Sequence, residues 1–197
     1  MQEIAELTEQ VEDAEHETEK VKEALEDGAI GSASLVGRKE KVVPSTAALI
    51  NGAASHSVEF DDIYRDAGYH PGSPVISAAL AAAQSTGASG EMFLRGVIVG
   101  YETSTRIGEA VMPSHYNFWH TTGTVGSFGA AASAATAMRL NHEQFMHAVA
   151  TVGTFAAGLQ QAFLSQAMSK PLHGGHAADA GVLAALAASK GVTGALD

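Results

Sequence analysis

The sequence predicts an all-α fold, a multi-helix bundle of about seven helices behind a helical N-terminal arm. The chain has 197 residues, of which 46% are hydrophobic and 17% charged, so it has ample material for a buried core. Aromatic residues make up only 6%, and there are 21 glycines, so the apolar content consists mainly of small and aliphatic side chains. Such residues favour closely packed helices over a β-sandwich, and no segment has a convincing sheet pattern.

The first predicted element is an acidic amphipathic helix over residues 3–26. Residues 1–27 hold 11 acidic residues and two lysines, so they carry most of the net charge of −11. This arm (1–28) precedes a nearly neutral helical domain (29–197), and it either packs on that domain or serves as a dimerising or solvated arm. Its apolar positions have the three-and-four spacing of a heptad, namely Ile4, Leu7, Val11, Ala14, Thr18, Val21 and Leu25.

The domain that follows is predicted to begin with a short hairpin or an extended loop over residues 31–43. Pro44 and Ser45 then open a helix that runs to about residue 58. In the next helix, Ser73 is the expected cap and Pro74 the first helical residue. Further helices are expected over 89–112, from after 120 to 138, over 142–157 with an Asn141–Gln144 capping box, over 158–169 and over 177–190.

Composition excludes several classes of function. The chain has no cysteine, which rules out disulfides, thiolate nucleophiles and cysteine-held zinc or iron–sulfur sites from this chain. It opens acidic, with no signal peptide, and no apolar run has the length of a membrane span. We therefore expect a cytoplasmic protein with no membrane partner. An acidic balance without a basic patch argues against nucleic acid as a partner.

Five of the nine histidines lie in three polar connections between apolar helices, at 59–70, 115–120 and 170–176, together with Asp61, Asp62, Asp66 and Lys170. Functional residues are often found on loops that a rigid scaffold presents. The histidine spacings do not match a metal-binding motif, and neither a nucleophile elbow nor a phosphate loop occurs. We therefore expect no bound metal.

General acid–base chemistry is the class that remains. The carboxylates Glu59, Asp61 and Asp62 accompany several histidines and one lysine in an otherwise apolar region. Burial would move the pKa values of carboxylates up and of lysine down, towards neutrality, where proton transfer is efficient. The alternative is structural, with these groups capping helix ends or pairing with Arg65 and Arg106.

Four segments together resemble the MmgE/PrpD family, which includes 2-methylcitrate dehydratase, cis-aconitate decarboxylase and iminodisuccinate epimerase. They occur in the family's order and spacing, and the resemblance runs from about residue 31 to the end of the chain. The segments are 51–62 (NGAASHSVEFDD), 70–80 (HPGSPVISAAL), 119–129 (WHTTGTVGSFG) and 170–178 (KPLHGGHAA).

The resemblance implies an all-helical domain in a homodimer, with the site in a cleft between this domain and a smaller lid domain. It implies a lyase, of the 2-methylcitrate dehydratase type, that acts on a small di- or tricarboxylate by acid–base chemistry without metal or organic cofactor. Within the family, a decarboxylase or an epimerase is the alternative.

Site residues follow from the same motifs. His70 is similar to the family's catalytic histidine, which exchanges a proton at a carbon next to a carboxylate. His120 matches the second site histidine, and Lys170 matches the lysine that holds a substrate carboxylate. Glu59 stands where many members have Asp and is taken as the fourth catalytic residue.

Two further residues are expected to bind substrate. Asp62 closes the acidic motif and is also expected to order the loop, and His173 follows the site lysine. Ile63 stands where several members carry a site threonine, which puts the identity of the substrate in question.

The resemblance also predicts that the lid domain is missing from this chain. A second hypothesis is therefore a truncated or split helical domain that is not catalytic alone and needs a lid on another chain. A third hypothesis, an interaction module built on the acidic arm, rests only on the heptad spacing of residues 4–25.

Overall fold

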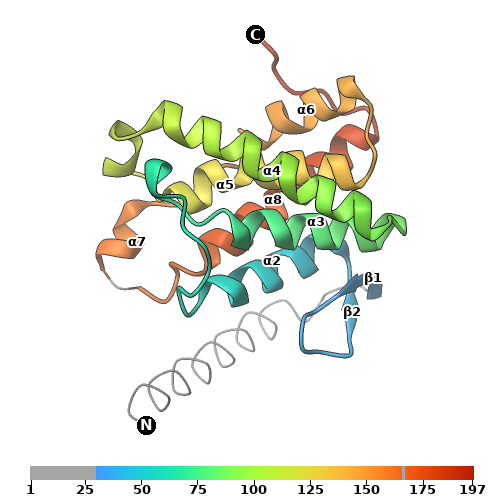
Figure 1. Cartoon of the computed structure of the whole chain (residues 1–197), viewed down its shortest axis with the longest axis horizontal. Coiled ribbons are helices and arrows are strands. Elements are labelled where there is room, and N and C mark those ends of the chain that lie inside the picture. The colour runs from blue at the N-terminus through green and yellow to red at the C-terminus, as the bar shows by residue number, and fades with distance from the viewer. Residues whose placement is uncertain (1–29, 166) are drawn as a thin grey trace.

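A computed structural model describes residues 30–165 and 167–197. The helix predicted over residues 3–26 lies outside the described residues. The described chain is mainly helical, with one small sheet at its N-terminal side (Figure 1). No helix among the described residues is both long enough and apolar enough to cross a membrane.

Seven α-helices and two short strands make up the described fold, which confirms the all-α prediction. A hairpin comes first, and two 3₁₀ turns interrupt the connections. The elements are β1 (Ile30–Ser34), β2 (Lys41–Val42), α2 (Pro44–His56), η1 (Arg65–Ala67), α3 (Gly72–Thr86), α4 (Gly90–Val111), η2 (Ser114–Asn117), α5 (Thr121–Ala137), α6 (His142–Val152), α7 (Gln160–Leu164) and α8 (Leu172–Ser189).

Helix α5 forms the centre of the bundle. It packs against α8, α4, α3 and α6, and nearly all of its residues are buried. The helices approach one another closely because glycines lie at their contacts. A Cβ on Gly181 of α8 would lie 2.4 Å from the Cβ of Ala130 on α5. A Cβ on Gly100 of α4 would lie 2.8 Å from the carbonyl oxygen of Gly129. The small residues of the sequence therefore set the distances between helices.

The hairpin is the first of the two alternatives predicted for residues 31–43. β1 and β2 pair antiparallel, with Ser34 opposite Lys41. The Ser34 amide donates to the side chain of Gln84 on α3 at 2.7 Å, and Asn51 on α2 donates to the Ser34 carbonyl at 3.0 Å. These bonds fix the hairpin to both helices.

The prediction for the start of α3 was wrong. Ser73 does not cap the helix, because its hydroxyl donates to the Gly52 carbonyl at 2.9 Å instead. The helix starts at Gly72, whose amide donates to the Asp62 carboxylate at 3.0 Å. A carboxylate from another connection thus satisfies one of the free amides at this end.

The bounds of the last three helices also differ from the prediction. The helix expected to reach residue 157 ends at Val152, and only residues 160–164 of the next one are helical. Between them, Gly158 has φ 134°, outside the helical region. α8 begins at Leu172, and so includes Gly174 and Gly175, which the sequence predicts to lie in the connection before the helix. A Cβ on Gly175 would lie 2.3 Å from a carbonyl oxygen of α2, so these glycines serve helix contact.

The predicted capping box of α6 is confirmed. The Asn141 side chain accepts from the Gln144 amide at 2.9 Å, and the Gln144 side chain accepts from the Asn141 amide at 3.1 Å. Two donors at this helix end are therefore satisfied reciprocally.

Candidate active site

Four helix ends place histidines next to one another. His56 is the last residue of α2, and His70 lies two residues before α3. His120 is the N-cap of α5, and His173 is the second residue of α8. Three of these ends are helix N-termini, whose free amides and partial positive charge favour anions. The topology therefore creates a suitable environment for a carboxylate.

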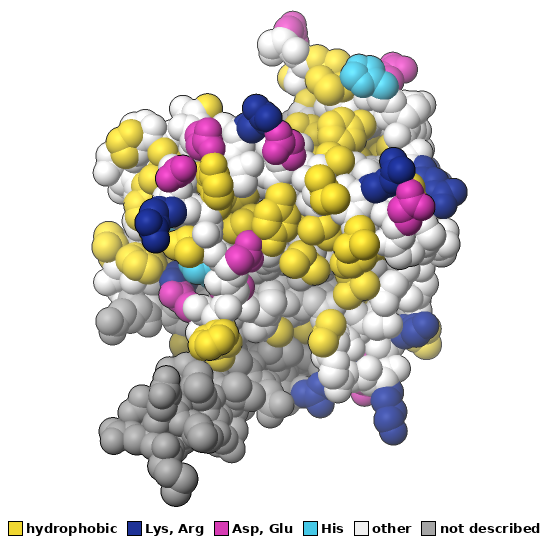
Figure 2. Space-filling model, in the orientation of Figure 1, with side chains coloured by type: hydrophobic (Ala, Val, Ile, Leu, Met, Phe, Trp, Pro, Cys, Tyr) yellow, Lys and Arg dark blue, Asp and Glu magenta, His cyan; other side chains and the backbone are white. Residues whose placement is uncertain are grey.

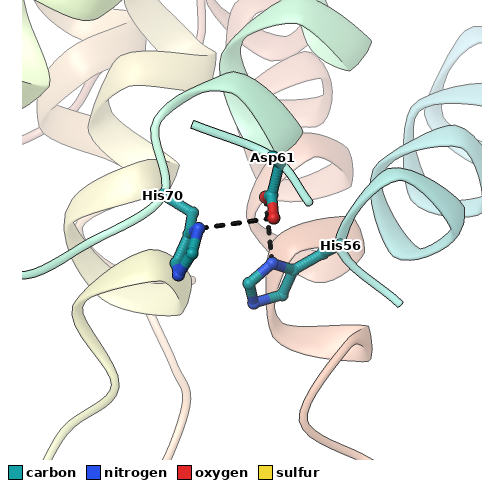
Figure 3. Close-up of side chains that lie close together, drawn as sticks. All are labelled: His56, Asp61 and His70. Carbon is teal, nitrogen blue, oxygen red and sulfur yellow. Dashed lines mark hydrogen bonds and ion pairs between the residues drawn. The ribbon is translucent and has the colours of Figure 1, made fainter. Parts of the chain in front are cut away.

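Asp61 lies between two of the histidines (Figure 3). Its Oδ2 is 3.0 Å from Nδ1 of His56, and its Oδ1 is 3.3 Å from Nδ1 of His70. The His56 side chain is completely buried, and that of Asp61 is only 8% exposed. His70 is 15% exposed, and the other nitrogen of its ring points away from Asp61.

A continuous series of ring contacts extends from this group to α8. The ring centroids of His56 and His70 lie 4.8 Å apart, and those of His56 and His120 lie 5.8 Å apart in a nearly parallel arrangement. His120 in turn contacts His173, with 3.0 Å between their Nδ1 atoms. The fold thus brings three predicted site residues, His70, His120 and His173, into one cluster with His56 and Asp61.

The surroundings raise the pKa of one histidine of the cluster and lower the pKa of two others. Contact with Asp61 raises the pKa of His70, and this outweighs the opposing effect of burial. Burial, together with the neighbouring histidines, lowers the pKa of His120 to about 3. Burial likewise lowers the pKa of His173. Divergent pKa values within one site separate a proton donor from groups that stay neutral.

Glu59 and Lys170 form an ion pair beside this cluster. Each is joined to it through the backbone, since the Glu59 amide donates to the His56 carbonyl and the His173 amide donates to the Lys170 carbonyl. Lys170 Nζ also lies 4.6 Å from the centre of the Phe163 ring, and burial lowers its pKa. Among the contacts of the described residues, neither member of the pair touches His70.

Two cavities flank the segment around α7. One, of about 550 Å³, is lined by Glu59 and Lys170 together with Phe163, Leu164 and Met168. The other, of about 570 Å³, is lined by His173 and His176 among others. Both volumes are in the range of small-molecule sites.

Asp62 has both carboxylate oxygens engaged by protein groups. Oδ1 accepts from the Gly72 amide at 3.0 Å, and Oδ2 accepts from the Tyr101 hydroxyl at 2.9 Å. These bonds attach the connection to α3 and α4, which is the ordering role expected from the sequence. Its predicted role in substrate binding stays a prediction.

His56 is not among the residues predicted from the sequence, and Asp61 was expected only as one member of a group of carboxylates. Both lie within the segment 51–62, and the five-residue spacing between them spans the end of α2. Among the described residues, His56, Asp61 and His70 are also the group that could hold a metal ion, with ligand atoms within 4.8 Å of one another. A metal there would have to displace the hydrogen of the His56–Asp61 hydrogen bond, and the expectation of no metal stays a prediction.

The MmgE/PrpD N-terminal domain family matches residues 14–197. The chain belongs to the MmgE/PrpD family. The match begins within the predicted arm, so the family domain includes the second half of that arm. It also includes all four helix ends that carry the histidine cluster.

Among curated proteins, the chain is similar to cis-aconitate decarboxylases. It is 33% identical to the cis-aconitate decarboxylase-like protein oryM of Aspergillus oryzae over 173 residues, which are 83% of this chain and 36% of that protein. Identity to the cis-aconitate decarboxylase of Aspergillus terreus is 30% over 168 residues, 82% of this chain and 34% of the relative. Identity to the Homo sapiens cis-aconitate decarboxylase is 33% over 162 residues, which are 78% of this chain and 33% of that protein. The chain thus spans about a third of the length of these relatives.

Proposed function

We propose that this MmgE/PrpD domain carries the proton-transfer residues of a lyase that acts on small di- or tricarboxylates by acid–base chemistry alone. The observation that carries the proposal is the division of the histidine cluster. His70 has a raised pKa and stands ready to hold a proton, while its neighbour His120 has a pKa lowered to about 3 and stays neutral. His70 is the proposed proton donor or acceptor at carbon.

The surroundings of His70 fit a polyanionic substrate. The N-termini of α3, α5 and α8 converge here and favour negative charge. Lys170 supplies a cation that would bind one carboxylate, released from Glu59 when substrate enters. Neutral His120 donates or accepts a hydrogen bond without adding charge. Such fixed dipoles stabilise the negative charge that develops next to a carboxylate.

The names of the relatives make decarboxylation of cis-aconitate the first reaction to test. Loss of CO2 from a carboxylate next to a double bond leaves an electron pair on carbon, which one proton then quenches. An acid with a raised pKa, such as His70, fits that step. Dehydration of 2-methylcitrate is the second candidate, in which Glu59 or His70 removes the proton from carbon and then gives a proton to the hydroxyl group, which leaves as water.

A different kind of function is a helical domain that needs a lid from elsewhere. Large apolar side chains are exposed near the site, including Phe60 (78% exposed) and Phe118 (70%) on the connections and Leu164 (66%) at the end of α7. A lid domain or a separate lid chain would cover them. If so, the chain alone binds carboxylates weakly and turns nothing over.

We also propose a cytoplasmic homodimer. Figure 2 shows hydrophobic side chains gathered over α4, where Leu94 and Ile98 are exposed. A second copy of the chain would bury this face. Analytical ultracentrifugation of the wild type and of Ile98→Glu tests it: a dimer that the substitution dissociates supports the proposal, and a wild-type monomer contradicts it.

The activity test compares the wild type with His70→Ala and with a matched control, His142→Ala, whose side chain is exposed at the start of α6. The proteins are made in the longest form that the gene encodes and incubated with cis-aconitate and with 2-methylcitrate. Loss of substrate in the wild type and control, but not in His70→Ala, supports the proposal. Equal turnover in all three would remove His70 from the mechanism.

A further inference from the structure

We propose that Asp61 and His56 are positioning residues that hold His70 in the tautomer with hydrogen on Nδ1, so that Nε2 is the atom that exchanges protons with a ligand. The inference about the tautomer stands on the geometry of the cluster. Only its consequence for catalysis rests on the proposed function. Figure 3 shows the arrangement, with Asp61 between the two rings.

The two oxygens of Asp61 are divided between the two histidines. Oδ2 takes the hydrogen bond of His56 at 3.0 Å, which leaves Oδ1 for His70 at 3.3 Å. Among the described residues, Asp61 Oδ1 and His70 Nδ1 are both buried without a hydrogen bond, and the 3.3 Å ion-pair contact is the polar contact that they share. An unpaired buried polar atom is costly, so each depends on the other.

The charge of Asp61 decides which atoms carry hydrogen. Burial of the carboxyl group opposes ionisation, but the hydrogen bonds from His56 and His70 together hold its pKa well below its usual range. The ionised carboxylate has only acceptors to offer. Both Nδ1 atoms that face it must therefore be donors, and in the neutral form of His70 the lone pair is on Nε2.

His56 fixes the orientation of the carboxylate. It is fully buried at the end of α2, and its ring is held between those of His70 and His120. Its bond to Oδ2 restricts rotation of the Asp61 side chain, so Oδ1 stays directed at His70. The exposed part of the His70 ring is then the side away from Asp61, since its Nδ1 is buried.

A bound metal ion is the rival explanation for two imidazoles and one carboxylate at this distance. A metal ligated by the Nδ1 atoms would require both of them to be without hydrogen. The proposal thus requires hydrogen on Nδ1 of His56 and His70, whereas a bound metal requires that these two atoms carry none. One NMR spectrum distinguishes the two arrangements.

The decisive experiment is a long-range ¹H–¹⁵N correlation spectrum of the chain with ¹⁵N-labelled histidine, recorded above the titration of His70. The wild type should show hydrogen on Nδ1 and none on Nε2 for both His56 and His70. Hydrogen on Nε2 of His70 in the wild type would overturn the proposal. So would binding of one added Zn²⁺ at micromolar concentration that Asp61→Asn abolishes.

Substitutions then separate positioning from simple structural support. Asp61→Asn should convert His70 to a mixture of tautomers. His56→Asn retains a donor near the position of Nδ1 and should keep the wild-type tautomer, whereas His56→Leu should not. If all three variants leave the tautomer of His70 unchanged, Asp61 does not position it.

The catalytic consequence has its own readout. In an active, longest form of the protein, Asp61→Asn should lower kcat about 10²-fold with KM within about twofold, because binding groups are untouched while the proton is misplaced. His56→Asn should retain more kcat than His56→Leu. A correct tautomer together with no turnover on any carboxylate would defeat the proposed function and leave the positioning intact. Turnover with an unaltered kcat in Asp61→Asn would support the proposed function and contradict the positioning role of Asp61.

Discussion

The Nδ1 atoms of His120 and His173 lie 3.0 Å apart, so one ring donates a hydrogen bond and the other accepts it. This contact requires at least one neutral ring, because two protonated imidazoles would place hydrogen against hydrogen. It joins the N-cap of α5 to the first turn of α8. The neutral half of the proposed site is therefore built from two helix ends.

His120 should remain neutral throughout the physiological range. Burial and the nearby histidines lower its pKa from 6.5 to about 3 in the folded state. A ¹⁵N titration should show no protonation of His120 above pH 5. A His120 inflection close to pH 6.5 would contradict the assignment.

The same shift predicts how stability depends on pH. The unfolded chain binds a proton at His120 from about pH 6.5 downward and the folded chain does not, so the free energy of unfolding should fall as pH drops from 6.5 towards 3. His120→Asn cannot protonate and should lose less stability across this window. The raised pKa of His70 acts in the opposite direction, with stability lost as pH rises above 6.5, so the comparison between wild type and variant isolates His120. Urea denaturation at several pH values measures the free energy of unfolding of both proteins. The same pH dependence in the wild type and in His120→Asn would refute the prediction.

Lys170 should matter for binding. Lys170→Met removes the cation of the 550 Å³ cavity and should raise KM or Kd for a tricarboxylate about tenfold or more, whereas Lys170→Arg should retain part of the affinity. Lys190→Met, at an exposed position after α8, is the matched control. Calorimetric titration of the carboxylate gives the answer, and an unchanged Kd in Lys170→Met would exclude this residue from the binding site.

Helix packing can be tested apart from function. A Cβ on Gly100 would lie 2.6 Å from Cγ1 of Val75 and 2.8 Å from the Gly129 carbonyl, so Gly100→Ala should lower the free energy of unfolding by about 1–3 kcal/mol. Gly90→Ala, in the same helix with nothing within 4 Å of its Cβ, should change it by about 0.5 kcal/mol or less. Equal effects of the two substitutions would mean that close approach of α4 and α5 does not limit stability.

Much of the fold followed from local rules. Apolar spacing and capping residues predicted the helices, and the Asn141–Gln144 box formed as expected. The errors came from long-range contacts. Asp62 satisfies the first amide of α3 from another connection, so Ser73 was free to bond elsewhere. Gly174 and Gly175 looked like a turn because their contact with α2 is not visible in the sequence.

The sequence singled out His70, His120 and His173, which the fold brings into one cluster, but it did not predict the contacts within that cluster. Polar connections between apolar helices indicated where the ionisable groups would gather, and the motifs pointed to His70, His120 and Lys170. Nothing local distinguishes His56 from an ordinary residue of a helix, since only the folded chain places it beside Asp61 and His120. Proton positions depend on such contacts and could not be derived from spacing.

The most direct test of the central claim is a ¹H NMR time course in D2O with cis-aconitate and 2-methylcitrate, using the protein in the longest form that its gene encodes. We predict loss of one of these substrates in the wild type and in His142→Ala, with deuterium appearing at a carbon next to a carboxylate if the reaction is decarboxylation of cis-aconitate. His70→Ala should show neither, with an unchanged helical circular dichroism spectrum. Deuterium incorporation and turnover in folded His70→Ala at the wild-type rate would contradict the account.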